Sequence, residues 1–313
     1  MNKLIELIEN AKSIAITGHV NPDGDCVGST LGLYNYISDN YKDKKVTVSL
    51  EKPSMKFSYM NGYEYITEDP VVADLLISLD AADKQRLGER SVMLESAKLS
   101  ICIDHHITNT KFSSYNIVED FRSSTCELLY TLLEYGKISV NTAICLYTGI
   151  VHDTGVFRYQ STTRETMEIA GALMDKGFDF TKIIDDSFFR KDFKAKQLLG
   201  LVLMEAKQAF DGRCCYCAVN YETWNKYVSD KKKMDGIIDN LRTIDGVEIA
   251  LFMYETAKDE YKISLRSINK DVSHIALAFG GGGHIRASGA TAQGNAEEIL
   301  KIILPMIEKE LNG

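Results

Sequence analysis

The chain has 313 residues, of which 45% are hydrophobic and 26% are charged, with only four prolines. This composition excludes a disordered or low-complexity chain, and the length predicts two compact domains rather than one. The formal net charge of −8 excludes binding along many phosphates of a long nucleic acid through a broad basic surface. It is compatible with a small anionic substrate that is bound by local positive groups.

Charged residues interrupt the N-terminal segment 1–16 every few positions, which predicts neither a signal peptide nor a membrane span. We therefore expect a cytoplasmic protein without a membrane partner. Seven cysteines lie mostly in apolar runs and lack the paired C-x-x-C spacing of a zinc site. We interpret them as reduced residues of the core or the surface.

In chain order, the first half alternates short apolar runs with helical patterns, which is typical of βαβ units. This pattern predicts an α/β domain with a mainly parallel sheet flanked by helices. Strands are predicted at 13–18, 45–50, 74–80 and 99–104, and a helix at 26–39. The last two strands are continuous apolar runs, as expected in a sheet that is covered on both faces.

Two further helices are predicted from capping-box starts and glycine stops. One begins at Ser124-x-x-Glu127 and ends at Gly136, and the other begins at Thr162-x-x-Glu165 and ends at Gly177.

The remaining sequence predicts a charged helical connector and a smaller domain with a mixed sheet. Strands are predicted at 214–220, 247–256 and 261–267, followed by a terminal helix at 295–311. The predicted domain boundaries are 1–187 for the first domain, 188–208 for the connector and 209–313 for the second domain.

Acidic residues and histidines gather where the predicted strands of the first domain end. These residues are His19, Asp23, Asp25, Asp80, Asp104, His105, His106 and, after an apolar helical run, Asp153. Because the carboxyl ends of parallel strands lie along one edge of a sheet, we expect these side chains to meet at a ligand site.

Each of these residues also has an ordinary structural interpretation, and Asp25 alone fits a helix cap as well as a ligand. Asp80 and Asp104, however, follow runs that are predicted to be buried, where an uncompensated carboxylate is costly. Carboxylates together with imidazoles favour Mn²⁺ or Mg²⁺ over a structural Zn²⁺ site. At least six ligands leave room for two ions, which can activate water and stabilise charge on a phosphoryl group.

Four segments resemble the motifs of the DHH phosphoesterases, in the family's order and with similar spacing. They are GHVNPDGDCVGS (18–29), DAAD (80–83), IDHHIT (103–108) and HDTGVFRY (152–159). The resemblance implies a hydrolase with two divalent ions. Mn²⁺ is the preferred ion, and Mg²⁺ or Co²⁺ are alternatives.

The same resemblance implies a role for each residue of the cluster. One ion would be bound by His19, Asp23 and Asp80, and the other by Asp25, Asp80, His105 and Asp153. His106 would face the substrate phosphate as a hydrogen-bond donor or general acid, and Asp104 would orient a neighbouring histidine. The predicted catalytic residues are thus His106, Asp104 and the bridging Asp80.

A second resemblance lies near the C-terminus. YKISLRSIN (261–269) and FGGGGHIRASGA (279–290) are similar to the DHHA1 domain of the nanoRNase/pAp-phosphatase group. A glycine run alone is more often a flexible turn. The resemblance implies binding of substrate phosphates or the terminal nucleotide, across the interdomain cleft, by Arg266, Gly280, Gly281, Gly282, Gly283 and His284. Arg158 is a further candidate, and equally a structural or solvated arginine.

The function implied is hydrolysis of very short oligoribonucleotides, such as linear pApA, to mononucleotides, and of 3′-phosphoadenosine 5′-phosphate (pAp) to AMP. One alternative is a stand-alone cyclic di-AMP phosphodiesterase, which uses the same metal chemistry. Another is a nucleotide- or RNA-binding module in which the metals only shape the site. The resemblance also suggests a homodimer.

Overall fold

The computed structural model describes residues 2–234 and 236–313, which divide between Arg190 and Lys191 into two compact units. Each unit has its own sheet, five-stranded in the first and six-stranded in the second. Within these residues, no helix combines the length and the apolar character that a membrane span requires.

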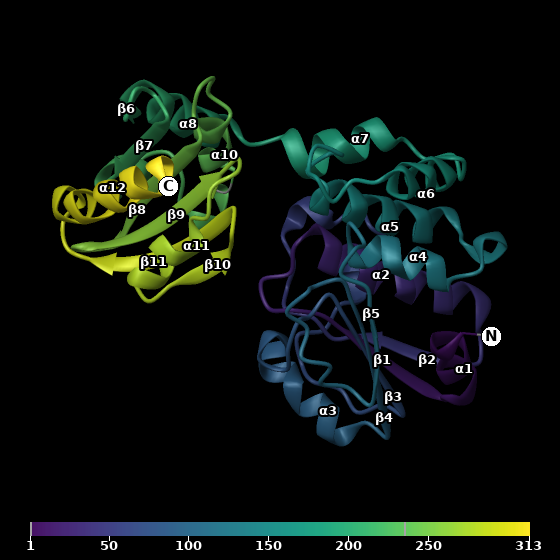
Figure 1. Cartoon of the computed structure of the whole chain (residues 1–313). Coiled ribbons are helices and arrows are strands. Elements are labelled where there is room, and N and C mark those ends of the chain that lie inside the picture. Colours follow the sequence, from purple (N-terminus) through teal and green to yellow (C-terminus); the bar gives the residue numbers. More distant parts are fainter. Residues whose placement is uncertain (1, 235) are drawn as a thin grey trace. The chain divides into compact units, whose positions relative to one another are not determined.

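The first unit is built on an all-parallel sheet in the order β2-β1-β3-β4-β5 (Figure 1). The strands are β1 Ser13–Thr17, β2 Lys45–Val48, β3 Leu75–Leu79, β4 Leu99–Asp104 and β5 Tyr115–Val118. The sequence predicts the first four, but not β5, which is a short and incompletely buried edge strand. Because the strand order reverses direction between β1 and β3, their carboxyl ends form the switch point where ligands bind in such sheets.

Alternating side chains of the strands pack on the two faces of this sheet. Ile14 and Ile16 contribute to the main core, whereas Ala15 and Leu76 pack with Met93 in a smaller cluster on the other face. Figure 1 shows α2, α4 and α5 together above one face. The helices are α1 Lys3–Asn10, α2 Gly24–Asn40, α3 Met93–Ser96, α4 Thr125–Leu132, α5 Val140–Asp153, α6 Arg164–Met174 and α7 Phe180–Ile184.

The predicted end of α4 is wrong by several residues, although its start is correct. The Ser124 hydroxyl accepts a hydrogen bond from the Glu127 N–H at 3.0 Å, as an N-cap should. The helix ends at Leu132, and Gly136 lies in a separate 3₁₀ turn. The Glu127 carboxylate does not complete the predicted capping box, because it accepts hydrogen bonds from Ser123 instead.

The predicted start of α6 is also displaced. Its N-cap is Thr163 rather than Thr162, and Thr166 rather than Glu165 is the partner in the capping box. The helix ends at Met174, before Gly177. The helical connector is interrupted as well. A π-helical turn, Asp185–Phe189, follows α7, and residues 190–192 separate it from α8, Phe193–Glu205.

The second unit contains a mixed sheet in the order β10-β11-β9-β8-β7-β6, in which only the neighbours β7 and β8 run parallel. One face packs against α11 and α12, and the other packs against α8, α9 and α10 along β7 and β8. The predicted α/β class with a mixed second sheet is confirmed. The strands are β6 Lys207–Ala209, β7 Cys214–Val219, β8 Ile249–Ala257, β9 Glu260–Ser267, β10 Gly282–His284 and β11 Ala287–Gln293. The helices are α9 Tyr221–Trp224, α10 Ile237–Arg242, α11 Ser273–Ala278 and α12 Ala296–Asn312.

All seven cysteines are free and buried. The prediction of reduced core residues is therefore correct, and the surface alternative is wrong.

Candidate metal centre

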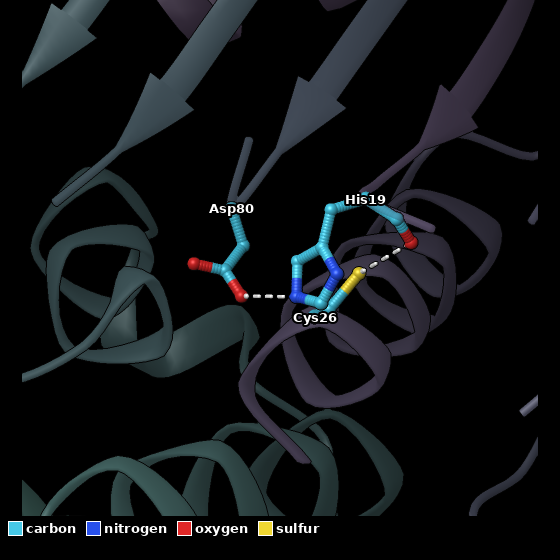
Figure 2. A group of neighbouring side chains, drawn as sticks. All are labelled: His19, Cys26 and Asp80. Atoms are coloured by element: carbon cyan, nitrogen blue, oxygen red, sulfur yellow. Dashed lines mark hydrogen bonds and ion pairs between the residues drawn. The ribbon is translucent and has the colours of Figure 1, made fainter. Parts of the chain in front are cut away.

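His19 and Asp80 meet at the switch point between β1 and β3. His19 lies two residues after β1, and Asp80 directly follows β3. Figure 2 shows the two side chains facing each other, with 3.4 Å between His19 Nε2 and Asp80 Oδ2. Asp80 has a φ of 58°, a conformation that is strained for a residue with a Cβ and that is enriched at functional sites.

A second group of side chains gathers at the other oxygen of Asp80. His105 Nε2 lies 3.7 Å from Asp80 Oδ1, 3.9 Å from Asp25 Oδ2 and 3.0 Å from Asp153 Oδ2. Asp25 is in the first turn of α2, and Asp153 is the last residue of α5. Asp80 thus has one carboxylate oxygen toward each group, which is the arrangement that a bridging ligand requires.

Asp23, rather than Asp25, is the N-cap of α2, and it also lies near His19. Its Oδ1 caps α2 by accepting hydrogen bonds from the N–H groups of Asp25 and Cys26, and the same oxygen lies 3.7 Å from His19 Nε2. The side chain is 58% exposed, so Asp23 lies at the rim of the cluster rather than inside it.

Cys26 lies beside the first group, although the sequence predicts no role for it at the site. Figure 2 shows its sulfur next to the His19 ring, within 4.8 Å of donor atoms of His19 and Asp80. The thiol contacts the carbonyl oxygen of His19 at 3.9 Å. Burial raises the pKa of the Cys26 thiol well above its usual value, which favours a packed thiol over a thiolate.

Asp104 contacts His106, so His106 is the histidine that Asp104 is predicted to orient. The distance from His106 Nδ1 to Asp104 Oδ1 is 2.8 Å, and the Asn109 amide donates to the other oxygen at 2.7 Å. Burial alone would raise the pKa of Asp104, but the contacts with His106 and Asn109 outweigh it and lower the pKa. Asp104 therefore remains a carboxylate that accepts a hydrogen bond from His106 Nδ1–H.

The carboxylates of the cluster form ion pairs with His19 and His105. Because these carboxylates outnumber the histidines, the cluster has an excess of negative charge. Burial raises the pKa of Asp25 well above its usual value, and the neighbouring Asp80 and Asp153 raise it further. Burial would lower the pKa of His105, but Asp153 and Asp25 raise it to about 11. Such a site binds protons or cations to compensate its charge. Carboxylate and imidazole donors fit Mn²⁺ or Mg²⁺.

The start of α4 supplies contacts to Asp25 and Asp80 that the sequence does not predict. The N–H groups of Thr125 and Cys126 donate to the two oxygens of Asp25 at 2.7 and 2.9 Å. The Thr125 hydroxyl also donates to Asp80 Oδ1 at 3.1 Å. The Ser124-x-x-Glu127 pattern locates this helix start, but no feature of the sequence links it to Asp25.

In the second unit, Arg266 and His284 lie in one row across the sheet. Arg266 on β9 pairs with Ala287 on β11, which in turn pairs with His284 on β10. Directly paired residues point to the same face, so the small Ala287 lies between Arg266 and His284. The register therefore brings together two of the residues that are predicted to bind phosphate.

The four glycines do not form a single flexible turn. Gly280 follows α11 with a φ of 70°, whereas Gly282 and Gly283 belong to β10. A Cβ on Gly281 would lie 2.2 Å from the carbonyl oxygen of Gly289, and one on Gly283 would lie 2.5 Å from that of Ala287. These two glycines are thus required for the close pairing of β10 with β11.

Arg158 is exposed in the first unit, in the turn after α5. Its role in substrate binding, and binding across an interdomain cleft, stay predictions.

Comparisons with known proteins identify two family domains in the chain. The DHH family, N-terminal domain, matches residues 13–150, and the DHHA1 domain matches residues 211–309. The bifunctional oligoribonuclease and PAP phosphatase NrnA of Bacillus subtilis (strain 168) is 27% identical over 295 residues, which are 92% of each chain.

Two solved structures share the fold. The crystal structure of an exopolyphosphatase-related protein from Bacteroides fragilis is 31% identical, covers 98% of this chain and 94% of its own, and has a TM-score of 0.91. RecJ from Thermus thermophilus, solved in complex with Mn²⁺, is 12% identical, covers 98% of this chain and 53% of its own, and has a TM-score of 0.56. The chain therefore belongs to the DHH family and carries a DHHA1 domain in its C-terminal unit.

Proposed function

We propose that this protein is a metal-dependent phosphoesterase that hydrolyses very short oligoribonucleotides, including linear pApA, to mononucleotides, and pAp to AMP. The observation that carries the proposal is the buried cluster around Asp80, in which all four DHH motifs contribute side chains. The Bacillus subtilis relative, which is named for both activities, supports it over nearly the whole chain.

The cluster would hold two divalent ions, preferably Mn²⁺, with Asp80 between them. The first would be bound by His19, Asp23 and Asp80, and the second by Asp25, Asp80, His105 and Asp153. When bound, the ions would supply Lewis-acid activation of water and stabilise phosphoryl charge.

The chain's own residues would position the substrate and move its protons. His106, held by Asp104, would donate a hydrogen bond or a proton at the reacting phosphate. Arg266 and His284, on one face of the second sheet, would bind a further phosphate together with the glycines that precede His284.

A stand-alone cyclic di-AMP phosphodiesterase is not favoured, because the relative is named for oligoribonucleotides and pAp. A non-catalytic binding module is disfavoured because every motif position of the cluster carries a metal-binding or proton-transferring side chain. The cytoplasmic location and the homodimer stay predictions.

The substitution Asp80→Ala tests the proposal. Because Asp80 contacts both groups of ligands, we expect loss of bound Mn²⁺ and a fall in pApA and pAp hydrolysis of about a hundredfold or more. The measurements are metal analysis and chromatography of the products. Asp39→Ala, an exposed position on α2, is the matched control and should leave both unchanged. Full activity and metal content in a folded Asp80→Ala variant would contradict the proposal.

A further inference from the structure

We propose that Thr125 is a positioning residue that fixes Asp25 and Asp80 for the second metal ion. The inference rests on the proposed function for the presence of that ion, which would lie among Asp25, Asp80, His105 and Asp153. Thr125 lies outside the four DHH motifs of the sequence. We expect it to affect the second ion and not the first.

Thr125 contacts two carboxylates at once. Its backbone N–H donates to Asp25 Oδ2 at 2.7 Å, and its hydroxyl donates to Asp80 Oδ1 at 3.1 Å. All three residues are buried, with 2% exposure or less. Hydrogen bonds to carboxylates in such a place are strong and directional, so they restrict the rotation of both ligands.

The contacts of Thr125 lie on the side of the second ion. The hydroxyl contacts Asp80 Oδ1, which is the oxygen that lies toward His105, whereas Asp80 Oδ2 lies toward His19. Asp25, the other partner of Thr125, also belongs to the His105 group. Because Asp80 Oδ1 is the atom that loses a hydrogen bond, removal of the hydroxyl should disturb the second ion much more than the first.

Thr125 can fix these ligands because its own segment is anchored. The buried Glu127 carboxylate accepts hydrogen bonds from Ser123 and from the Thr166 hydroxyl, the latter at 2.7 Å. The Arg122 carbonyl, in the same segment, lies 3.3 Å from His105 Nδ1. A proton on Nδ1 that is donated to this carbonyl leaves the His105 Nε2 lone pair for a metal. Residues 122–127 thus contact three predicted ligands of the second ion.

The test compares Thr125→Val with Thr125→Ser. Valine keeps the shape and the backbone N–H but removes the hydroxyl, and serine keeps the hydroxyl. In calorimetric titration of the metal-stripped protein with Mn²⁺, we expect Thr125→Val to weaken the second binding event about 10- to 100-fold and to leave the first unchanged. Thr125→Ser should restore the second event. With pApA, the kcat of Thr125→Val should fall at subsaturating Mn²⁺ and recover as Mn²⁺ is raised.

Thr142→Val is the matched control. Thr142 is equally buried, and its hydroxyl contacts the Ser139 hydroxyl at 3.2 Å in the first turn of α5. This variant should bind both ions normally. If Thr125→Val does not fold, Thr125→Ala gives the same comparison, since it removes the hydroxyl without adding a clash.

An unchanged second affinity in Thr125→Val, or an equal loss of both ions, would overturn the inference. A wild-type protein that binds two ions but hydrolyses none of the substrates would contradict the proposed function alone. In that case, selective loss of the second ion in Thr125→Val would still support the positioning role.

Discussion

The two adjacent histidines of the third motif both lie 3.7 Å from Asp80 Oδ1, but their other partners differ. His105 directs Nε2 toward Asp25, Asp80 and Asp153, as a ligand would. His106 instead contacts the buried Asp104, which is further fixed by Asn109. We therefore propose that Asp104 is a positioning residue that acts through His106.

The substitution Asp104→Asn separates this role from metal binding. An amide lacks the charge that favours the Nδ1–H form of His106, so that His106 no longer presents a fixed proton donor to the substrate. We expect the kcat for pAp to fall about a hundredfold or more, while the bound Mn²⁺ stays unchanged. Steady-state kinetics and metal analysis of the same preparation check this.

Asn109→Ala is the graded control, because it removes one donor to Asp104 but leaves the charge in place. Its kcat should fall less than that of Asp104→Asn. Loss of Mn²⁺ from the Asp104→Asn variant would show that Asp104 acts on the metals themselves, and an unchanged kcat would remove it from the mechanism.

Every predicted metal ligand lies in the cluster, because strand ends and motif order determine where these residues meet. The sequence does not reveal which oxygen of Asp80 lies toward which histidine, since that depends on side-chain geometry. It does not reveal Thr125 either, because a threonine at the start of a helix is an ordinary residue there.

At the scale of secondary structure, the site depends on close packing of α2, α4 and α5. A Cβ on Gly28 of α2 would lie 2.5 Å from the carbonyl oxygen of Cys145 on α5. A Cβ on Gly149 of α5 would lie 2.7 Å from Asp25 Oδ1 and 2.2 Å from Cys126 Sγ. Glycine at these positions lets three helices approach closely, which brings Asp25 to the start of α4.

Gly149→Ala is therefore expected to separate these helices. Overpacking of this kind should lower the free energy of unfolding by about 1–3 kcal/mol, and displacement of Asp25 should weaken Mn²⁺ binding. Gly171→Ala on α6 is the matched control, since a Cβ there meets nothing within 4 Å. It should stabilise the protein by about 0.5–1 kcal/mol through helix propensity. Urea denaturation and Mn²⁺ titration measure both effects, and a Gly149→Ala variant that keeps wild-type stability and affinity would refute the packing argument.

The strands and most helices follow from the apolar pattern, whereas helix ends do not. α4 ends at Leu132, before the nearest glycine, and α6 begins after Thr163 because its capping box joins Thr163 to Thr166, one residue beyond the predicted start. Half of the glycine run forms β10 because pairing with β11 holds it extended, which is a long-range contact that no local pattern predicts.

At the scale of the whole molecule, the charge is unevenly distributed. Residues 191–313 contain seventeen lysines and arginines and seventeen aspartates and glutamates, so the net charge of −8 belongs to residues 1–190. Neither part has the excess of basic residues that binding along a long RNA requires. The groups proposed to bind the substrate are local, namely the metal ions, Arg266 and His284, which suits a short anion.

The most direct test of the proposed phosphoesterase function is product analysis with the metal-stripped protein resupplied with Mn²⁺. Linear pApA, pAp, cyclic di-AMP and a 24-residue RNA are incubated in parallel, and the products are separated by chromatography. We predict rapid conversion of pApA and pAp to AMP, with the long RNA nearly intact. Preferential opening of cyclic di-AMP, or no hydrolysis of any of the four, would contradict the proposed function.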